Sequence, residues 1–200
     1  MTSVDFYFGT GSRYSYLAAT RIPSLQSETG ATFRWRAVYS PELIRRAGSD
    51  PFAKDMVRGQ YEAAYRTRDA TRWAAFLGVP YVEPDFAAVD WRRIALWCVA
   101  AELLGGGPAF GAAVLHSAFG LGTPASTEVQ LAAAAGSVGV SAFRMSGLVA
   151  DGSAEWAHER NVQDALVAGA FGVPTFVVDD GEVFWGQDRM PLLAHHLCKR

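Results

Sequence analysis

Phe171-Gly-Val-Pro-Thr-Phe-Val-Val-Asp-Asp-Gly-Glu-Val-Phe-Trp-Gly-Gln-Asp-Arg189 is the stretch of this 200-residue chain that decides the fold. Its first apolar run, which contains Val177 and Val178, favours a buried strand because β-branched and aromatic residues suit a pleated surface. Asp180-Gly181 then predicts a two-residue type I′ hairpin turn, which needs φ > 0 at both central residues. Pro174 stands at the start of the first strand, where its missing N–H costs no ladder hydrogen bond. We therefore expect a loop, a hairpin of two strands and the beginning of a helix.

The N-terminus carries a second strand signal, followed by a helix. Residues 4–8 alternate as a half-buried strand does, and helical sequence follows from Leu17. Gly9 and Gly11 between them lack the third glycine and the Lys-Ser/Thr of a phosphate loop, so we interpret them as letting the backbone approach a ligand closely. Ser12 precedes the helix, where unpaired N–H groups and the helix dipole favour an anion such as a thiolate. Its hydroxyl can donate a hydrogen bond to that anion.

Gly172-Val-Pro-Thr-Phe176 before a hairpin resembles the cis-proline loop of the thioredoxin fold, so we predict a cis bond between Val173 and Pro174. The resemblance implies an α/β protein with a thioredoxin-like, glutaredoxin-type sheet and a large all-helical insertion. In that fold the residue before the proline offers its main-chain N–H and C=O to a thiol-bearing ligand. Redox-active members open the first helix with Cys-x-x-Cys, but here Ser12-Arg-Tyr-Ser15 takes that place. Disulfide chemistry by a dithiol is therefore excluded.

Motifs near both ends resemble the 2-hydroxychromene-2-carboxylate isomerases, which are relatives of the kappa-class glutathione transferases. That family opens with Phe-Tyr-Phe and Ser-Pro-(Phe/Tyr)-Ser-Tyr-Leu, and this chain has Phe6-Tyr-Phe8 and Ser12-Arg-Tyr-Ser-Tyr-Leu17. The family closes with Gly-Val-Pro-Thr-Phe and Phe-(Trp/Phe)-Gly-(Gln/Ser)-Asp-Arg, and this chain repeats the first motif and has Phe184-Trp-Gly-Gln-Asp-Arg189. A middle segment, residues 68–80, matches in part. The resemblance thus covers nearly the whole chain.

This resemblance implies a glutathione-dependent isomerase that interconverts 2-hydroxychromene-2-carboxylate and trans-o-hydroxybenzylidenepyruvate, or a close analogue from aromatic catabolism. It implies Ser12 as the catalytic residue, which stabilises the glutathione thiolate. The glutathione-binding residues that it implies are Ser12, Val173, Pro174, Gln187 and Asp188. Glutathione is then a recycled co-substrate, and the other partner is a small aromatic keto acid. The family also leads us to expect a homodimer.

This chain departs from the family in two groups of residues that are expected to contact the organic substrate. Arg13 stands where family members usually carry proline after the catalytic serine. The family's Asn and Lys near the substrate align only loosely with this chain. Ser49 or Asp50 stands in for the Asn, and Lys54 or Arg58 stands in for the Lys. We therefore include Ser49 and Asp50 among the expected substrate-binding residues.

A carboxylate substrate also needs a cation, and arginine suits it because the planar guanidinium matches a carboxylate. Our candidates are Arg13, Arg68 and Arg72, of which the last two belong to one predicted helix. An ordinary surface ion pair between Asp69 and Arg72, at a spacing of i and i+3, is the alternative interpretation of that helix.

The order of signals predicts one interrupted sheet. Residues 1–40 and 170–200 are expected to form a discontinuous thioredoxin-like domain, and residues 41–169 a helical insertion domain. Pro23 is expected to kink or divide the first helix. The later helices are expected over 54–77, 91–104, from about 108 to 119, 127–135, after Ser141, over 154–168 and over 188–197, with Asp90, Thr127, Ser141 and Ser153 as caps.

Composition restricts the class of protein. The net charge of −2 argues against nucleic-acid binding, and no apolar run reaches transmembrane length. The first residues are polar and strand-like and show no signal-peptide pattern, so we expect a cytoplasmic protein. Cys98 lies in an apolar helical run and should be buried, whereas Cys198 lies near the terminus. Neither these cysteines nor the four histidines have metal-ligand spacing, so we expect no metal site.

Two other functions stay open at this point. One is a kappa-like glutathione transferase or peroxidase that acts on another electrophile. The other is a thioredoxin-fold binding module that has lost its cysteines. Retention of the glutathione motifs at both ends argues against the binding module.

Overall fold

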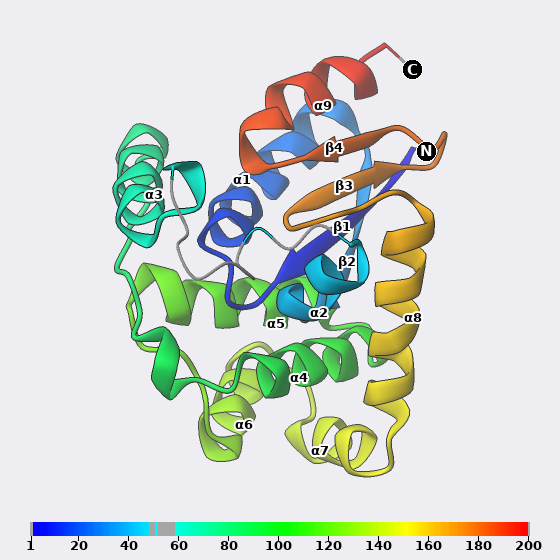
Figure 1. Cartoon of the computed structure of the whole chain (residues 1–200). Helices are drawn as coiled ribbons and strands as arrows, with labels where there is room; N and C mark the ends of the chain where they lie inside the picture. The colour runs from blue at the N-terminus through cyan, green and yellow to red at the C-terminus, as the bar shows by residue number, and fades with distance from the viewer. Residues whose placement is uncertain (1, 49–50, 52–58, 200) are drawn as a thin grey trace.

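The computed structural model describes residues 2–48, 51 and 59–199, and these form a mixed sheet of strand order β2-β1-β3-β4 (Figure 1). The strands are β1 (Ser3–Gly9), β2 (Thr32–Val38), β3 (Thr175–Val178) and β4 (Val183–Trp185). β1 runs parallel to β2 and antiparallel to β3, and β3 is antiparallel to β4. The C-terminal hairpin therefore completes the sheet that the N-terminus begins, as predicted.

Helices surround this sheet and fill most of the chain between β2 and β3. They are α1 (Arg13–Thr29), α2 (Ser40–Arg46), α3 (Ala63–Leu77), α4 (Trp91–Leu103), α5 (Gly107–Leu115), α6 (Glu128–Ser137), α7 (Ala142–Ala150), α8 (Ser153–Val167) and α9 (Met190–Leu197). Shorter turns are η1 (Gly59–Tyr61), η2 (Phe86–Ala88), the π-helical η3 (His116–Gly120) and η4 (Gln187–Arg189). Across the described ranges, none of the helices combines the length and apolar character that crossing a membrane requires. Division of the chain into two domains stays a prediction.

Helix ends follow the local signals in most places. Asp90, Thr127 and Ser141 each accept the N–H of the residue three positions later, as the predicted caps do. α8 instead begins at Ser153, after Gly152 with φ 84°, so Ser153 is not its cap. The helix expected from 188 begins with the turn η4, and α9 starts only at Met190.

Two expected helix boundaries were wrong. α1 is not divided at Pro23, because the buried Ile22 and Leu25 hold the helix to the core on either side of the exposed proline ring. Within its described part, the helix predicted over 54–77 is α-helical only from Ala63, and residues 59–61 form the separate 3-10 turn η1. Gly59 has φ 68°, which is left-handed backbone, and the cap residue before Ala63 is extended. These conformations end the helical register on the N-terminal side.

The hairpin between β3 and β4 is present, but its turn is not type I′. Gly181 has φ 91°, whereas no non-glycine residue of the described chain has positive φ, so Asp180 cannot supply the second left-handed position. The Gly181 N–H donates to the Val178 carbonyl (2.9 Å), and the Val178 N–H donates to the Glu182 carbonyl (3.0 Å). The turn therefore spans Asp179 and Asp180, and Gly181 follows it as the single left-handed residue.

The side chains of β1 alternate between two apolar layers. Phe6 and Phe8 lie on one face, where their rings contact Trp35 at 5.0 and 5.4 Å. Tyr7 lies on the other face, in a smaller cluster with Val38, Leu43 of α2, and Val162 and Ala165 of α8. Figure 1 shows α8 along the outer side of the sheet and α3 beside α1, with α4, α6 and α7 farthest from α9. The sheet is thus covered on both faces.

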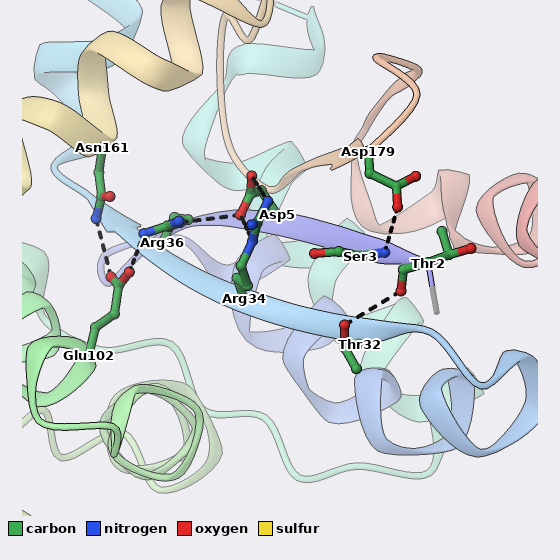
Figure 2. Close-up of polar contacts among 9 residues, drawn as sticks. All are labelled: Thr2, Ser3, Asp5, Thr32, Arg34, Arg36, Glu102, Asn161 and Asp179. Carbon is green, nitrogen blue, oxygen red and sulfur yellow. Dashed lines mark hydrogen bonds and ion pairs between the residues drawn. The ribbon is translucent and has the colours of Figure 1, made fainter.

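A chain of charged side chains links the sheet to the helical segment (Figure 2). Arg34 donates two hydrogen bonds of 2.7 Å to Asp5, and Arg36 donates to Asp5 (3.2 Å) and to Glu102 of α4 (2.5 Å). Asn161 of α8 donates to the same Glu102 (3.3 Å). Burial raises the pKa of the Glu102 carboxyl, although the neighbouring Arg36 opposes this shift. These contacts join β1, β2, α4 and α8.

α5 approaches the sheet closely at Gly111. A Cβ atom at this position would lie 2.9 Å from Trp35 Cε3 and 3.1 Å from Phe8 Cζ. Gly147 in α7 offers a contrast, because a Cβ there would meet no heavy atom within 4 Å. Both glycines lie inside helices, so only the surroundings of the added methyl group differ.

We expect Gly111→Ala to lower the free energy of unfolding by about 1–3 kcal/mol, because the methyl group overpacks the aromatic core. The matched Gly147→Ala should raise the free energy of unfolding by about 0.5–1 kcal/mol, the ordinary gain of alanine over glycine in a helix. Urea unfolding followed by circular dichroism measures both. Equal effects of the two substitutions would contradict the close packing of α5.

His158 of α8 is buried, and its Nε2 accepts the Tyr39 N–H (2.9 Å) at the end of β2. Burial lowers the pKa of the His158 imidazole, so the unfolded chain binds more protons at this site than the folded chain does. Stability should therefore be complete above the unfolded pKa of about 6.5 and fall as pH decreases below it.

We predict that His158 weakens the fold by at most about 1.4 kcal/mol per pH unit as pH falls from about 6.5 toward its folded pKa. His158→Gln should remove this part of the pH dependence, because the amide oxygen can still accept the Tyr39 N–H but does not titrate. Denaturant unfolding at several pH values compares the two chains. Curves that stay parallel between pH 7 and 5 would exclude a neutral buried His158.

Candidate functional site

Ser12 lies at the N-terminus of α1, directly after the end of β1, and only 6% of it is exposed. Its N–H donates to the Gly9 carbonyl (3.0 Å), which closes the turn between strand and helix. Its Oγ accepts the Ser15 N–H (3.1 Å) and so caps the helix. Because the cap uses the oxygen only as an acceptor, the hydroxyl hydrogen can donate to a ligand at the helix end. The first N–H groups of α1 and its dipole favour a negative charge there.

Gly9 and Gly11 leave no room for side chains, because other residues of the protein pack closely onto them. A Cβ on Gly9 would lie 3.0 Å from Val173 Cγ2 and 3.1 Å from Ser40. A Cβ on Gly11 would lie 3.0 Å from the Trp91 indole. The protein's own side chains therefore pack onto these glycines, and the close approach of a ligand to their backbone stays a prediction.

The loop before β3 borders this turn. The Val173–Pro174 bond is cis, which confirms the prediction. The Gly172 carbonyl accepts the Thr175 hydroxyl (2.7 Å), and the Pro174 carbonyl accepts the Gly186 N–H (2.9 Å). Within residues 2–48, 51 and 59–199, the N–H and carbonyl of Val173 between them make no hydrogen bond. Val173 thus offers a main-chain donor and acceptor next to the residue, Gly9, whose carbonyl holds Ser12.

Gln187 and Asp188 open η4 and differ in exposure. Gln187 is 2% exposed, and its side-chain Oε1 has no hydrogen-bond partner in the described structure. Its carbonyl accepts a hydrogen bond from Arg21 Nη1 of α1 (3.0 Å). Asp188 is exposed and lies 3.7 Å from the Arg189 guanidinium. A buried acceptor without a donor destabilises the protein by about 1–3 kcal/mol, so Gln187 Oε1 is a candidate ligand contact.

Arg13 is the first residue of α1 and is 5% exposed. Its Nη2 lies 2.5 Å from Glu83 Oε1, and its Cζ lies 5.3 Å from the centre of the Phe86 ring. Tyr81 donates a short hydrogen bond to the other oxygen of Glu83. Arg13 Nε and Nη1 are buried and have no partner among the described residues. The structure therefore brings Arg13 next to Ser12, with part of its hydrogen-bonding capacity unused.

α3 supplies a second cation, but not one of the two expected. Asp69 accepts the Tyr14 hydroxyl (2.9 Å) from α1, and the ion pairs of the described residues do not include one between Asp69 and Arg72. Arg66, one turn before Asp69, shares the face that α3 turns toward α1. Burial lowers the pKa of the Arg66 guanidinium, and the charge of Arg13 lowers it further. Arg68 and Arg72 are exposed on other faces of α3 and do not join this group.

Arg66 and Glu83 were missed in the sequence. The spacing of Arg66, Ala70, Trp73 and Leu77 is that of one helical stripe, and it would have placed Arg66 on the inner side of α3. No local pattern marks Glu83, which lies in an irregular segment. The other expected substrate-binding residues, Ser49 and Asp50, lie outside the described residues, as do Lys54 and Arg58.

Known proteins resemble this chain over nearly its whole length. The model of the DSBA-like thioredoxin domain matches residues 3–198. A 2-hydroxychromene-2-carboxylate isomerase from Sphingobium xenophagum is 31% identical over 197 residues, which are 98% of this chain and 97% of that relative. One from Pseudomonas putida is 27% identical over 201 residues, with 98% and 96% covered. A solved structure of a 2-hydroxychromene-2-carboxylate isomerase superposes with a TM-score of 0.85 at 25% identity, over 98% of this chain and 95% of that one.

Proposed function

Because this chain belongs to the 2-hydroxychromene-2-carboxylate isomerase family of DSBA-like thioredoxin domains, we propose that it is a glutathione-dependent isomerase. Its substrate class is the aromatic α-keto acids, with 2-hydroxychromene-2-carboxylate and trans-o-hydroxybenzylidenepyruvate as the interconverted pair. The observation that carries the proposal is the position of the unbonded Val173 main chain beside the capped N-terminus of α1. Serines in place of a Cys-x-x-Cys agree with a reaction that has no net oxidation or reduction.

The residues present fit glutathione, a tripeptide with a thiol, two amides, two carboxylates and an amine. Val173 can pair with the cysteinyl main chain through its free N–H and carbonyl. Gln187 Oε1 is a buried acceptor that lacks a donor, and an ammonium group can supply one. The exposed Asp188 adds a negative charge for the same ammonium group. Arg21, which binds the Gln187 carbonyl, lies nine residues along α1 from Ser12. This is about 13.5 Å of helix rise, a few Å more than the roughly 10–11 Å of an extended tripeptide.

When bound, glutathione would supply a thiolate that adds reversibly to a conjugated carbon of the substrate, so that a double bond becomes a rotatable single bond. The chain's part is to hold that sulfur as an anion. The Ser12 hydroxyl donates to it, and the N-terminus of α1 lowers the pKa of the thiol by stabilising the charge. Arg13 adds a cation at the same helix end. Val173 fixes the cysteinyl main chain, so the sulfur points to one place.

Glutathione binding is the first test. Calorimetry should show saturable binding, and glutathione at a hundredfold excess over Kd should stabilise the fold by about 2.7 kcal/mol.

Gln187→Met should weaken glutathione binding about tenfold, or 1.4 kcal/mol, because an acceptor is lost. The same substitution should leave the ligand-free fold equally or more stable, because it removes an unsatisfied buried oxygen. Gln163→Met, at an exposed position of α8, is the matched control. Unchanged glutathione affinity in Gln187→Met would show that Gln187 does not belong to the site. If the natural chain does not bind glutathione, the alternative of a thioredoxin-fold binding module that has lost its cysteines is favoured.

Ser12→Ala tests the chemistry. Loss of the cap should lower stability by about 1 kcal/mol. Loss of the donor should lower turnover by about 10²–10³ and raise the pKa of the bound thiol. Turnover is followed by the absorbance of the chromene, and the thiol pKa by thiolate absorption during a pH titration. Ser24→Ala, exposed on the same helix, should change neither. An unchanged thiol pKa in Ser12→Ala would contradict the role of Ser12, and glutathione binding without chromene turnover in the natural chain would favour a transferase.

A further inference from the structure

The guanidinium of Arg13 has more donors than the protein uses. Arginine carries five N–H donors, yet among the residues that the structure describes only Nη2 of Arg13 has an acceptor, the carboxylate of Glu83. Only 6% of the Arg13 side chain is exposed, so water does not freely replace the missing partners. Buried N–H groups of a charged side chain without acceptors are strongly unfavourable. This arrangement points to an external acceptor of opposite charge.

A second cation near α1, Arg66, also favours an anionic ligand at this place. Arg66 lies on the face of α3 that contacts α1, one turn from the Asp69 that holds Tyr14. Burial and the charge of Arg13 lower the pKa of the Arg66 guanidinium, and the charge of Glu83 opposes this shift. An anion bound between α1 and α3 would add a second favourable charge for both arginines. A carboxylate matches the planar guanidinium group, because the two can form two parallel hydrogen bonds.

A cluster of aromatic rings begins at Arg13. The Phe86 ring lies under its guanidinium, and Trp91 contacts Phe86 at 5.4 Å and Phe119 at 6.1 Å between ring centres. Phe86 and Trp91 are both half-buried, so part of each ring remains accessible. A cation next to accessible aromatic faces matches a ligand that joins a carboxylate to an aromatic ring.

Glu83 limits this site. Its carboxylate is held by Arg13 and by the Tyr81 hydroxyl, and 26% of its side chain is exposed. Glu83 therefore occupies the Nη2 group of Arg13. Its negative charge also repels any second carboxylate that approaches Nε or Nη1 of the same guanidinium group. We infer that Arg13 and Arg66 form the subsite for the carboxylate of the aromatic keto acid, and that Glu83 is an internal competitor that lowers the affinity of this subsite. The identity of the ligand rests on the proposed function.

Calorimetry with two matched probes tests the inference without turnover. Chromone-2-carboxylate carries the charge, and chromone-2-carboxamide is its neutral analogue. For the natural chain we expect the carboxylate to bind about 10- to 100-fold more tightly than the amide, the usual gain from charged hydrogen bonds. Arg13→Pro should abolish this preference. Proline is favoured at the first helical position, so this variant should fold, and its melting temperature confirms that it does.

Glu83→Gln gives the sharper result, because an increase is expected. It keeps an acceptor for Tyr81 and removes the negative charge, so carboxylate affinity should rise about tenfold while amide affinity stays the same. Arg66→Gln should lower carboxylate affinity about tenfold. Arg144→Gln, which removes an exposed charge on α7, should have no effect. A Glu83 with a purely structural role predicts loss or no change of affinity in Glu83→Gln, and that result would overturn the inference.

Glutathione titrations of the same variants separate this inference from the proposed function. Glutathione binding with no carboxylate preference in the natural chain overturns the subsite and leaves the proposed function standing. Carboxylate preference without glutathione binding supports the subsite and removes the proposed function. If Arg13→Pro weakens glutathione and leaves the chromone preference unchanged, the cations serve glutathione, and the inference is overturned.

Discussion

The close packing of Gly9 against Val173 is the contact on which the rest of the site depends. It joins the end of β1 to the loop before β3, and a Cβ on Gly9 would lie 3.0 Å from the valine side chain. The antiparallel pairing of β1 with β3 holds the two segments in register. The N-terminus of α1 and the free main chain of Val173 consequently face one region. A thiol ligand bound by both meets a helix dipole and a hydroxyl donor together.

Positive charge is concentrated at that helix end from three sources. The unpaired N–H groups of the first turn carry partial charge, Arg13 adds a full charge within the same turn, and Arg66 adds another from α3. Burial strengthens all three, because the local dielectric constant is low. Glu83 and Asp69 compensate part of this charge, each held by a tyrosine hydroxyl. The balance suits a site that must bind anions and also release them.

The sheet and the helical segment contribute different chemistry. The sheet and its loops supply main-chain groups and the amide of Gln187, which are suited to a peptide-like ligand. The helical segment supplies Arg66, Glu83 and the Phe86 and Trp91 rings, which are suited to an aromatic acid. The ion-pair chain from Asp5 through Arg36 to Glu102 couples the two parts through β2 (Figure 2). The two sets of groups thus come from different parts of the chain, which this ion-pair chain joins.

The sequence by itself determined the features with short-range signals: the alternating strand β1, the C-terminal hairpin, the caps Asp90 and Thr127, and the cis bond before Pro174. Its motifs also led to Ser12, Val173 and Gln187 as candidates. Only the tertiary structure decided that Arg66 is half-buried on α3 while Arg68 and Arg72 are exposed, and that Glu83 pairs with Arg13. Local patterns indicate which residues form a helix. The partner of a charged side chain depends instead on which face of that helix packs against elements that are distant in the chain.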